Sequence, residues 1–430
     1  MKRNAVAVAV GALFIAPAAQ AQIVMGNDTI GTVQFYGKLY PQFIRATSSG
    51  ATETGASVST LASPTTGLCG TASSAGACNG TTAGSRFAVD SQNSYLGFRG
   101  ERKFGNTGLK GIWQIEQSIE LDGAVAGVFS NRNTFLGLAG GFGTVKLGNM
   151  DTIYKEYGQV EEIFGLTSGN FISPSNVLSQ IGIGNSSTAR FHERAKNSIQ
   201  YQTPEFQGFQ AGLQYSPDET KNDVGNTLNK ELWSMGVKWE SGPLYLSAQY
   251  ERHKDFFGGS FNVGASSLAN LVTDASNNKV PAPGAHSKDT AMRFSAAYKF
   301  GNHRVAGDIA RLKYEESGQA AGTKFVSYEH TNWAISFESS WGGPWRTAIE
   351  YVSGGEGTCK LTIGDCSTTG LKGALFGGGV AYDLDKQTFL YALAAQLKND
   401  PSAIYSNWAA SKPARGADIT QIALGMAYRF

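Results

Sequence analysis

The last ten residues, QIALGMAYRF at positions 421–430, alternate strictly between large apolar side chains and small or polar ones. A period of two is typical of a β-strand with one apolar face. Most domains end in a few loose polar residues, whereas this strand runs to the last residue and ends on the aromatic Phe430. We therefore expect a neighbouring strand to hold that end in place.

Alternating segments of this kind recur along the chain, whereas helical periodicity is almost absent. The composition agrees, because 54 Gly, 17 Tyr and 24 Phe against 12 Pro are typical of turns and strand faces. We predict sixteen strands, an even number. They lie at 32–44, 93–101, 108–119, 132–139, 142–149, 195–203, 207–215, 230–240, 243–253, 290–300, 303–313, 328–339, 345–352, 372–383, 387–397 and 418–430.

The connections between these segments alternate between two length classes. Most short ones contain Gly, Asn or Asp, as hairpin turns do. In a meander, alternate turns lie at opposite ends of the sheet, so all long loops lie on one side, as in outer-membrane barrels. The short links are 102–107, 140–141, 204–206, 241–242, 301–302, 340–344 and 384–386, and the long ones are 45–92, 120–131, 150–194, 216–229, 254–289, 314–327, 353–371 and 398–417.

Alternation in a single strand does not decide between a membrane barrel and a soluble β-sandwich, because both have one apolar face. Sixteen strands in series with asymmetric loops favour the all-β, 16-stranded antiparallel transmembrane barrel. Closure leaves no free edge in lipid, so strand 418–430 should pair with strand 32–44. Because proline cannot donate to a ladder, we expect Pro41 at a bend near the loop end of the first strand.

The first 21 residues resemble a secretory signal peptide. Lys2 and Arg3 precede an apolar run, and Ala19-Gln20-Ala21 fits a cleavage site. The alternative, a membrane helix, is disfavoured because the run is shorter than the roughly 20 residues that span a bilayer. We predict a mature barrel domain of residues 22–430, with 34 basic and 34 acidic residues after removal of Lys2 and Arg3. This balance does not indicate a nucleic-acid partner.

Four cysteines form two close pairs in the sequence, Cys69 with Cys78 and Cys359 with Cys366. In an exported protein they are interpreted as two local disulfides, although four cysteines allow three pairings. A zinc site is the alternative, but neither pair has the usual short ligand spacing.

Several motifs together resemble the trimeric, sixteen-stranded general diffusion porins of Gram-negative bacteria, and most of all their beta-proteobacterial branch. They are FYGKL at 35–39, SYLGFRGE at 94–101, NRNTFLGLAGGFGTVKLGN at 131–149, NSIQYQTPEFQGF at 197–209 and the terminal AYRF. The resemblance implies a homotrimer in the outer membrane, in contact with lipid and lipopolysaccharide, that passes small hydrophilic solutes and ions through a water-filled channel. It also implies that the third external loop, 150–194, folds into the barrel, after a first loop at 45–92. Phe430 is similar to the terminal aromatic residue that the outer-membrane assembly machinery reads in such barrels.

The resemblance also suggests which side chains line the channel. Loop acids would face basic residues on the inner wall, and the resulting transverse field would penalise apolar solutes. Tyr95 and Asn149 stand where the family often has basic residues, so we expect only a weak anion preference. The loop acids are Asp151, Glu156, Glu161 and Glu162. Of these, Glu161 and Glu162 lie within a possible short helix VEEIF and form the expected acidic face. The wall cations are Lys38, Arg99, Arg132, Arg194 and Lys196, and the other residues expected on the same wall are Tyr36, Tyr40, Tyr95, Lys110 and Glu116.

Other functions remain open at this point. A substrate-selective porin for sugars, phosphate or organic acids would need aromatic tracks or a basic cluster, which the wall tyrosines could supply. An outer-membrane protease or lipase would need a catalytic constellation, but the sequence lacks GxSxG, and HERAK at 192–196 has a lysine where HExxH needs a metal ligand. A surface protein that acts through its loops is the third class. We predict no enzyme activity, no metal and no cofactor.

Overall fold

The computed structural model describes residues 23–27, 31–59, 61, 84–123, 129–166, 169–184, 187–217, 219, 228–263, 267–407 and 414–430. The predicted signal peptide and the Cys69 and Cys78 pair lie outside the described residues.

The described chain forms a closed antiparallel barrel of sixteen wall strands, which confirms the predicted fold class. Two wall strands are each formed by two segments, β2 with β3 and β4 with β5. The strands are β1 (Ile23–Asn27), β2 (Gly31–Leu39), β3 (Gln42–Ser49), β4 (Arg86–Asp90), β5 (Tyr95–Lys103), β6 (Lys110–Ser118), β7 (Thr134–Gly140), β8 (Gly143–Asp151), β9 (Arg194–Gln202), β10 (Phe209–Pro217), β11 (Glu231–Ser241), β12 (Leu244–Lys254), β13 (Leu271–Thr273), β14 (Lys279–Pro281), β15 (His286–Phe300), β16 (His303–Ser317), β17 (Phe325–Ser340), β18 (Trp345–Gly354), β19 (Thr358–Leu361), β20 (Gly373–Asp383), β21 (Thr388–Asn399) and β22 (Asp418–Arg429).

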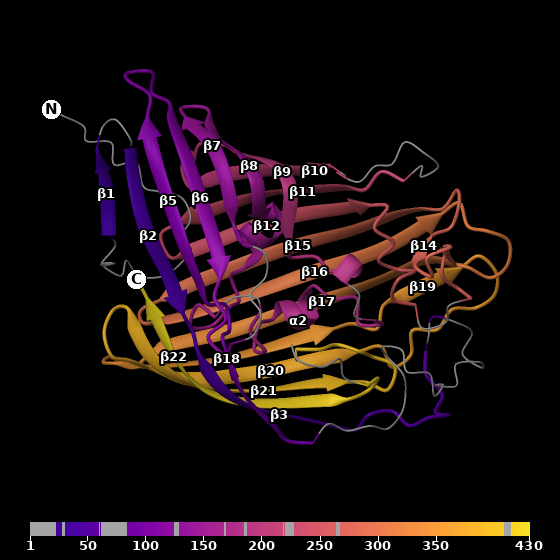
Figure 1. Cartoon of the computed structure of the whole chain (residues 1–430). Coiled ribbons are helices and arrows are strands. Elements are labelled where there is room, and N and C mark those ends of the chain that lie inside the picture. Colours follow the sequence, from indigo (N-terminus) through magenta and orange to yellow (C-terminus); the bar gives the residue numbers. More distant parts are fainter. Residues whose placement is uncertain are drawn as a thin grey trace.

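Helices are few and short: α1 (Ile153–Gly158), α2 (Ser175–Leu178) and the 3-10 turn η1 (Ser187–Ala189). Within the described ranges, none of the helices has the length and apolarity needed to cross a membrane. In Figure 1, β15 to β21 run from short turns on the left to longer connections on the right, and α2 lies inside the ring of strands. The short turns and long loops therefore lie at opposite ends.

The seam of the barrel joins the first and last wall strands, as predicted. Lys38 of β2 is opposite Arg429 of β22, and β3 continues the pairing with β22 as far as Ser49. The backbones of Gly37 and Phe430 exchange two hydrogen bonds, with N···O distances of 2.9 and 3.1 Å. The C-terminus accordingly lies beside β2 in Figure 1.

The prediction for Pro41 was right about a break but wrong about its place. Pro41 separates β2 from β3, yet the wall strand continues for eight residues to Ser49. Proline lacks a donor, but its carbonyl still accepts the backbone N–H of Met426 at 3.1 Å, so the ladder resumes beyond it. The predicted first loop, 45–92, therefore begins inside β3, and β4 occupies part of its end.

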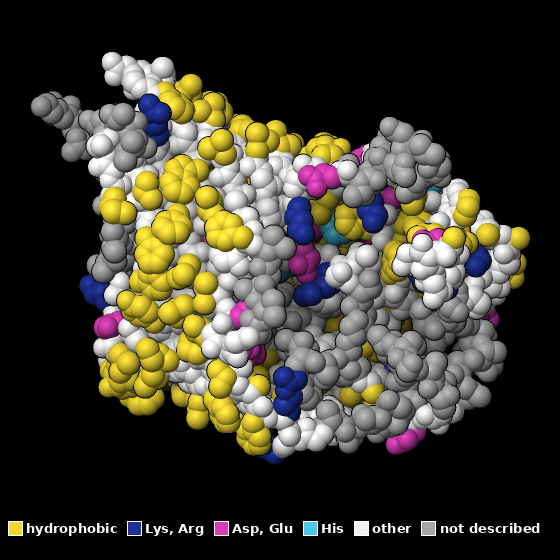
Figure 2. Space-filling model, viewed as in Figure 1, with side chains coloured by type: hydrophobic (Ala, Val, Ile, Leu, Met, Phe, Trp, Pro, Cys, Tyr) yellow, Lys and Arg dark blue, Asp and Glu magenta, His cyan; other side chains and the backbone are white. Residues whose placement is uncertain are grey.

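The outward face of the wall is apolar, as the alternation requires. Figure 2 shows hydrophobic side chains gathered over the strands at the left, while charged side chains appear in the opening beside them. The exposed fractions of outward side chains reach 66% at Leu136 and 62% at Leu424. Others on this face are Phe43, Phe87, Phe98, Leu147, Ile199, Phe294, Ile309, Ile335, Ile349, Phe376 and Ile422.

Deletion of Phe430 should weaken the seam. The deletion removes both backbone hydrogen bonds to Gly37 and the ring contacts with Phe35 and Tyr428, at centroid distances of 5.3 and 5.4 Å. At about 1 kcal/mol for each hydrogen bond, we expect a loss of about 2 kcal/mol or more in the free energy of unfolding. Urea unfolding of the purified protein, monitored by its heat-dependent gel mobility, measures this loss. An unchanged urea midpoint would contradict it.

Candidate functional site: loop 3 against the barrel wall

Residues 152–193, here called loop 3, connect β8 to β9 and pack against the inside of the wall. The Thr152 hydroxyl accepts the backbone N–H of Lys155 at 3.3 Å and caps α1. The backbone N–H of Tyr154 then donates to the Ser234 hydroxyl of β11 at 2.9 Å. Gly212 of β10 leaves room for Ile153, since a Cβ there would lie 2.5 Å from the Ile153 side chain.

The second half of loop 3 follows the opposite part of the wall. The Asn332 amide of β17 donates to the carbonyls of Val177 and Leu178, at 3.0 and 3.1 Å. These bonds satisfy carbonyls at the end of α2 that have no partner within the helix. Loop 3 therefore lines the barrel from β10 to β20 and reaches Arg429 at the end of β22, and the wall formed by β2 to β8 faces it across the lumen.

The prediction of a short helix over VEEIF, residues 160–164, is wrong. The helical turn lies earlier, at Ile153–Gly158, where Thr152 supplies the cap. Residues 160–164 are irregular because Phe164 adopts a left-handed backbone with a φ of 53°.

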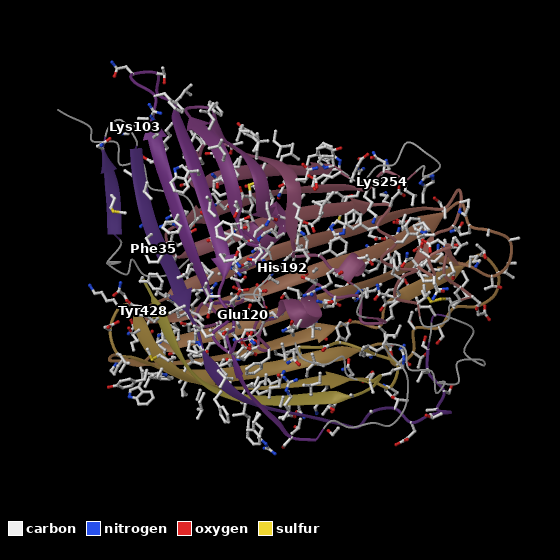
Figure 3. The ribbon with its side chains drawn as sticks, viewed as in Figure 1. Phe35, Lys103, Glu120, His192, Lys254 and Tyr428 are labelled. Atoms are coloured by element: carbon white, nitrogen blue, oxygen red, sulfur yellow. A yellow bond between two sulfur atoms is a disulfide. The ribbon has the colours of Figure 1, made fainter. Side chains whose placement is uncertain are left out.

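A buried ionic cluster fixes the centre of loop 3 to β15 and β16. The Arg293 guanidinium donates to Glu161 at 2.8 Å and to Asp308 at 2.7 Å, and Arg293 and Glu161 are at most 1% exposed. Its third nitrogen lies 3.1 Å from His192 Nδ1. Gly158 makes this approach possible, since a Cβ there would lie 2.9 Å from the guanidinium. Figure 3 places His192 well inside the ring of strands.

The cluster corrects the expectation for Glu161, which is buried against the wall instead of forming the acidic face of the loop. Burial raises the pKa of its carboxyl and Arg293 lowers it. Burial and the adjacent Arg293 hold the pKa of His192 well below its usual value, so the imidazole is neutral and its Nδ1 accepts from the arginine.

Two of the other three acids are also held by partners at the base of the loop. Asp151 forms ion pairs with Arg194 at 3.0 Å and with Lys155 at 3.2 Å. Glu156 accepts a hydrogen bond from the Gln202 amide at 2.7 Å. Glu162, which is half-buried, lies next to the buried Glu161 in the loop. The loop therefore presents less negative charge to the lumen than its composition suggests.

On the facing wall, tyrosines and cations form an interlocked layer. Tyr36 of β2 lies opposite Gly97 of β5, where a Cβ would be 2.6 Å from the ring. The missing side chain lets the Tyr36 hydroxyl reach across β5 and donate to Glu116 of β6 at 2.8 Å. The Arg99 guanidinium covers the Tyr36 ring at 4.6 Å, as is favourable for a cation above an aromatic face.

Lys38 and Arg132 extend this layer. The Lys38 ammonium lies 4.8 Å from the Tyr40 ring and 5.5 Å from the Tyr95 ring, while the Arg132 guanidinium lies 4.7 Å from Tyr95. Arg132 also approaches Glu116 at 3.7 Å. The structure thus brings together three of the predicted basic residues and all three predicted tyrosines.

The other predicted wall cations lie elsewhere. Arg194 is bound to Asp151 at the base of loop 3, and Lys110 pairs with Glu101 at 2.6 Å near the β5–β6 turn. Lys196 is exposed at a bulge, where it and Asn197 are both opposite Asn149. The bulge interrupts the alternation that predicted Lys196 and Arg194 on one face.

Sequence reasoning missed a second group of wall cations, Arg293, Arg304 and Arg346. Arg304 donates to the carbonyl of Val160 in loop 3, and Arg346 pairs with Asp383 at 2.7 Å and Glu338 at 3.3 Å. The signal was present, because in MRFSAAYKF the large apolar Met292 and Phe294 face outward and Arg293 between them must face inward.

A second segment, residues 402–407 before β22, also folds inward. The backbone N–H of Ile404 donates to Gly182 of loop 3 at 2.8 Å, and the Asn407 amide donates to Phe171 at 2.8 Å. Tyr405 is 1% exposed and occupies space left by Gly354 and Gly373. Two loops therefore fill this side of the lumen with a shared apolar core.

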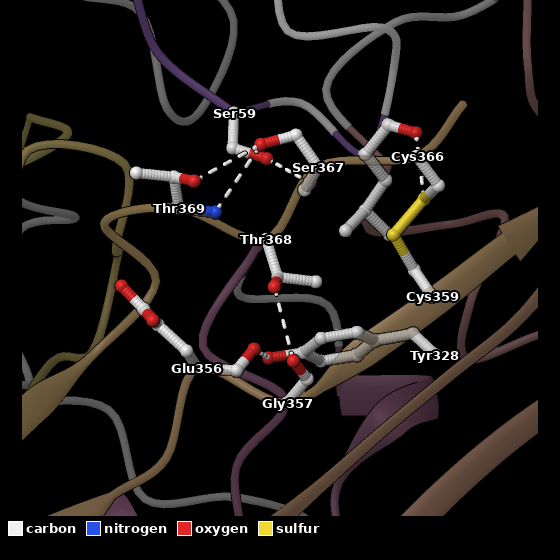
Figure 4. The surroundings of a disulfide bond; sticks show 10 residues. Ser59, Tyr328, Glu356, Gly357, Cys359, Cys366, Ser367, Thr368 and Thr369 are labelled. Atoms are coloured by element: carbon white, nitrogen blue, oxygen red, sulfur yellow. Dashed lines mark hydrogen bonds between the residues drawn. A yellow bond between two sulfur atoms is a disulfide. The ribbon is translucent and has the colours of Figure 1, made fainter.

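The external connections also contact one another. Cys359 and Cys366 form a disulfide, as predicted, and the Cys366 sulfur lies 3.0 Å from the Leu61 carbonyl oxygen (Figure 4). Ser59 bonds to the Ser367 carbonyl through its hydroxyl and to the Ser402 hydroxyl through its N–H. Three connections that are distant in sequence thus meet at the loop end of the barrel.

Replacing Arg293 by Met should loosen loop 3, because it leaves the buried Glu161 and Asp308 without their partner. Breaking a buried ion pair in this way costs about 3–5 kcal/mol in the free energy of unfolding. Urea unfolding of R293M measures the loss. The control R311M breaks the exposed pair with Glu329 and should change stability by at most about 1 kcal/mol. Equal effects of the two substitutions would refute the anchoring role.

Comparison with known proteins agrees with this architecture. The Gram-negative porin family matches residues 5–402 of the chain. The major outer membrane protein P.IB of Neisseria lactamica is 28% identical over 309 residues, which cover 65% of this chain and 82% of that protein.

Two solved structures share the fold. One is the anion-selective porin from Comamonas acidovorans, with a TM-score of 0.62, 19% identity and coverage of 93% of this chain and 99% of that one. The other is the trimer form of OmpT, an outer membrane protein of Vibrio cholerae, with a TM-score of 0.57, 16% identity and the same coverage. The family match spans most of the sequence and agrees with the closed barrel. The chain belongs to the Gram-negative porin family of the outer membrane.

Proposed function

We propose that the channel passes small hydrophilic solutes and ions by passive diffusion, with a weak preference for anions, between loop 3 and the wall formed by β2 to β8. The observation that carries this proposal is the unequal neutralisation of charge. Asp151 at the end of β8 and Glu161 of loop 3 are bound to Arg194 and Arg293. Across the lumen, Arg99 contacts neutral groups, the Tyr36 ring at 4.6 Å and the Gln34 amide oxygen at 2.5 Å. Fixed cations beside a narrow water path favour anions.

The mechanism is passage, with no bond made or broken. Within the described residues, no group of three or more His, Cys, Asp or Glu side chains is arranged to hold a metal ion. A hydrophilic solute can exchange part of its hydration for the polar wall groups, whereas an apolar solute would have to displace water ordered by the charges.

The remaining expectations from the family resemblance belong to the same proposal. They are a leader at residues 1–21 removed on export, a homotrimer, contact with lipid and lipopolysaccharide, and a role for Phe430 in recognition by the assembly machinery. The trimer form of the Vibrio cholerae structure and the wide apolar outer face support the homotrimer.

A substrate-selective channel for sugars is less well supported. An aromatic track needs ring faces open to the solute, but Tyr40 is fully buried and Tyr36 is 7% exposed beneath Arg99. The rings of Tyr36 and Tyr40 instead lie against the cations Arg99 and Lys38. Organic acids or phosphate would fit the basic wall, and block of the current by such anions at low concentration would favour that alternative.

Single-channel recording in a planar bilayer with a salt gradient tests the proposal. We expect stable open channels with a reversal potential of the sign for anions, and a smaller anion preference for R99Q and R132Q. Removing one charge beside the path changes the energy of an ion by at most about 1 kcal/mol, or about fivefold in permeability ratio. The control R311Q removes an exposed arginine of β16, away from the wall formed by β2 to β8, and should have the selectivity of the wild type. Cation preference in the wild type would disprove the proposed selectivity.

A further inference from the structure

The deepest part of loop 3 docks on two arginines that belong to the last part of the chain. Phe164 is 2% exposed, and its backbone N–H donates to Glu338 Oε2 of β17 at 2.9 Å. The Arg346 guanidinium lies 5.4 Å from the Phe164 ring and 4.8 Å from the Phe389 ring. Since Arg346 is itself fixed by Asp383 and Glu338, it offers the loop a rigid surface.

Arg429 makes the second contact. Its Nη2 donates to the Phe164 carbonyl at 3.1 Å, and its Nε donates to the Tyr40 hydroxyl. The guanidinium also lies 5.4 Å from the Phe389 ring. Gly165 permits this approach, because a Cβ at that position would lie 2.7 Å from Nη2. Both polar groups of the Phe164 backbone are therefore bound by the wall.

These contacts lie on the seam of the barrel. Arg429 is the last residue of β22 and is opposite Lys38 of β2, while Tyr40 lies between β2 and β3 on the other side of the seam. The backbone of Arg429 belongs to the wall, since its N–H donates to the Gln387 carbonyl at 3.0 Å. Only its side chain reaches the loop. The two sides of the docking site come together when the first and last strands pair.

We infer that Arg429 is a positioning residue that couples closure of the barrel to the placement of the constriction loop. Loop 3 docks fully only after β22 has paired with β2, and the Arg429 side chain then holds residues 163–166 in the lumen. Loss of that side chain releases this part of the loop while the backbone seam stays closed. The effect on conductance rests on the proposed channel function, whereas the docking itself does not.

The test uses R429K in the full-length protein, because lysine keeps the charge but cannot bond Tyr40 and Phe164 as a planar fork. We expect normal folded yield, but faster hydrogen exchange of the amides in 161–166. The undocked population should rise roughly ten- to hundredfold, as expected for loss of a charge-assisted hydrogen bond. In bilayers, the same variant should show a larger single-channel conductance and more open-channel noise. R311K serves as the matched control and should leave both readouts unchanged.

If the amides of residues 161–166 exchange at the same rate in R429K as in the wild type, the inference is overturned, even if the protein conducts. Conversely, if the wild-type protein carries no current in a bilayer, the proposed channel function is rejected. The hydrogen-exchange measurement would still decide whether Arg429 docks the loop. Pulse-labelled refolding tests the order of events: protection of residues 161–166 should follow protection of residues 419–428. Protection of the loop before the seam would refute the coupling.

Discussion

Pairing of backbone groups in the absence of water is the constraint on which this structure depends. In the lipid interior an open sheet edge leaves N–H and C=O groups unpaired, so a sheet can cross only as a closed ring. Closure explains why the pairing of β22 with β2 and β3 extends from Asp418 to Phe430. Pro41 is tolerated within this seam because its carbonyl still accepts from Met426.

Inside the ring, a wide lumen must be narrowed while the barrel stays folded. Loop 3 achieves this by binding its backbone and its buried charge to the wall. Arg293 holds Glu161 and Asp308, Asn332 holds the carbonyls of Val177 and Leu178, and Arg429 holds Phe164. In these contacts the acids of the loop side are bound to arginines, whereas Arg99 on the other wall lies beside the neutral Tyr36 and Gln34. The position of the loop therefore also sets the electrostatics of the passage.

Much of the fold followed from the sequence because the period of two is a local signal. The strands show an apolar outer face, and Gly, Asn or Asp occurs in most short turns, so strand number and seam could be predicted. Strand ends were less accurate, since β3 and β15 extend beyond their predicted limits into polar residues. The wall cluster of Lys38, Arg99 and Arg132 was predicted because those residues match family motifs. Arg293 and Arg346 were missed, although alternation alone would have placed them inward.

The sequence by itself determined the sixteen-stranded barrel and the inward placement of its polar side chains, because alternation and turn chemistry act between neighbouring residues. Only the tertiary structure decided which charges remain available to a solute. Glu161 and Asp151 look identical to lumen-facing acids in the sequence, yet each has an arginine partner that lies elsewhere along the chain. Such pairings depend on how closely a folded loop approaches the wall, which Gly158 and Gly165 permit at particular points. That approach is a property of the closed ring, and no local pattern encodes it.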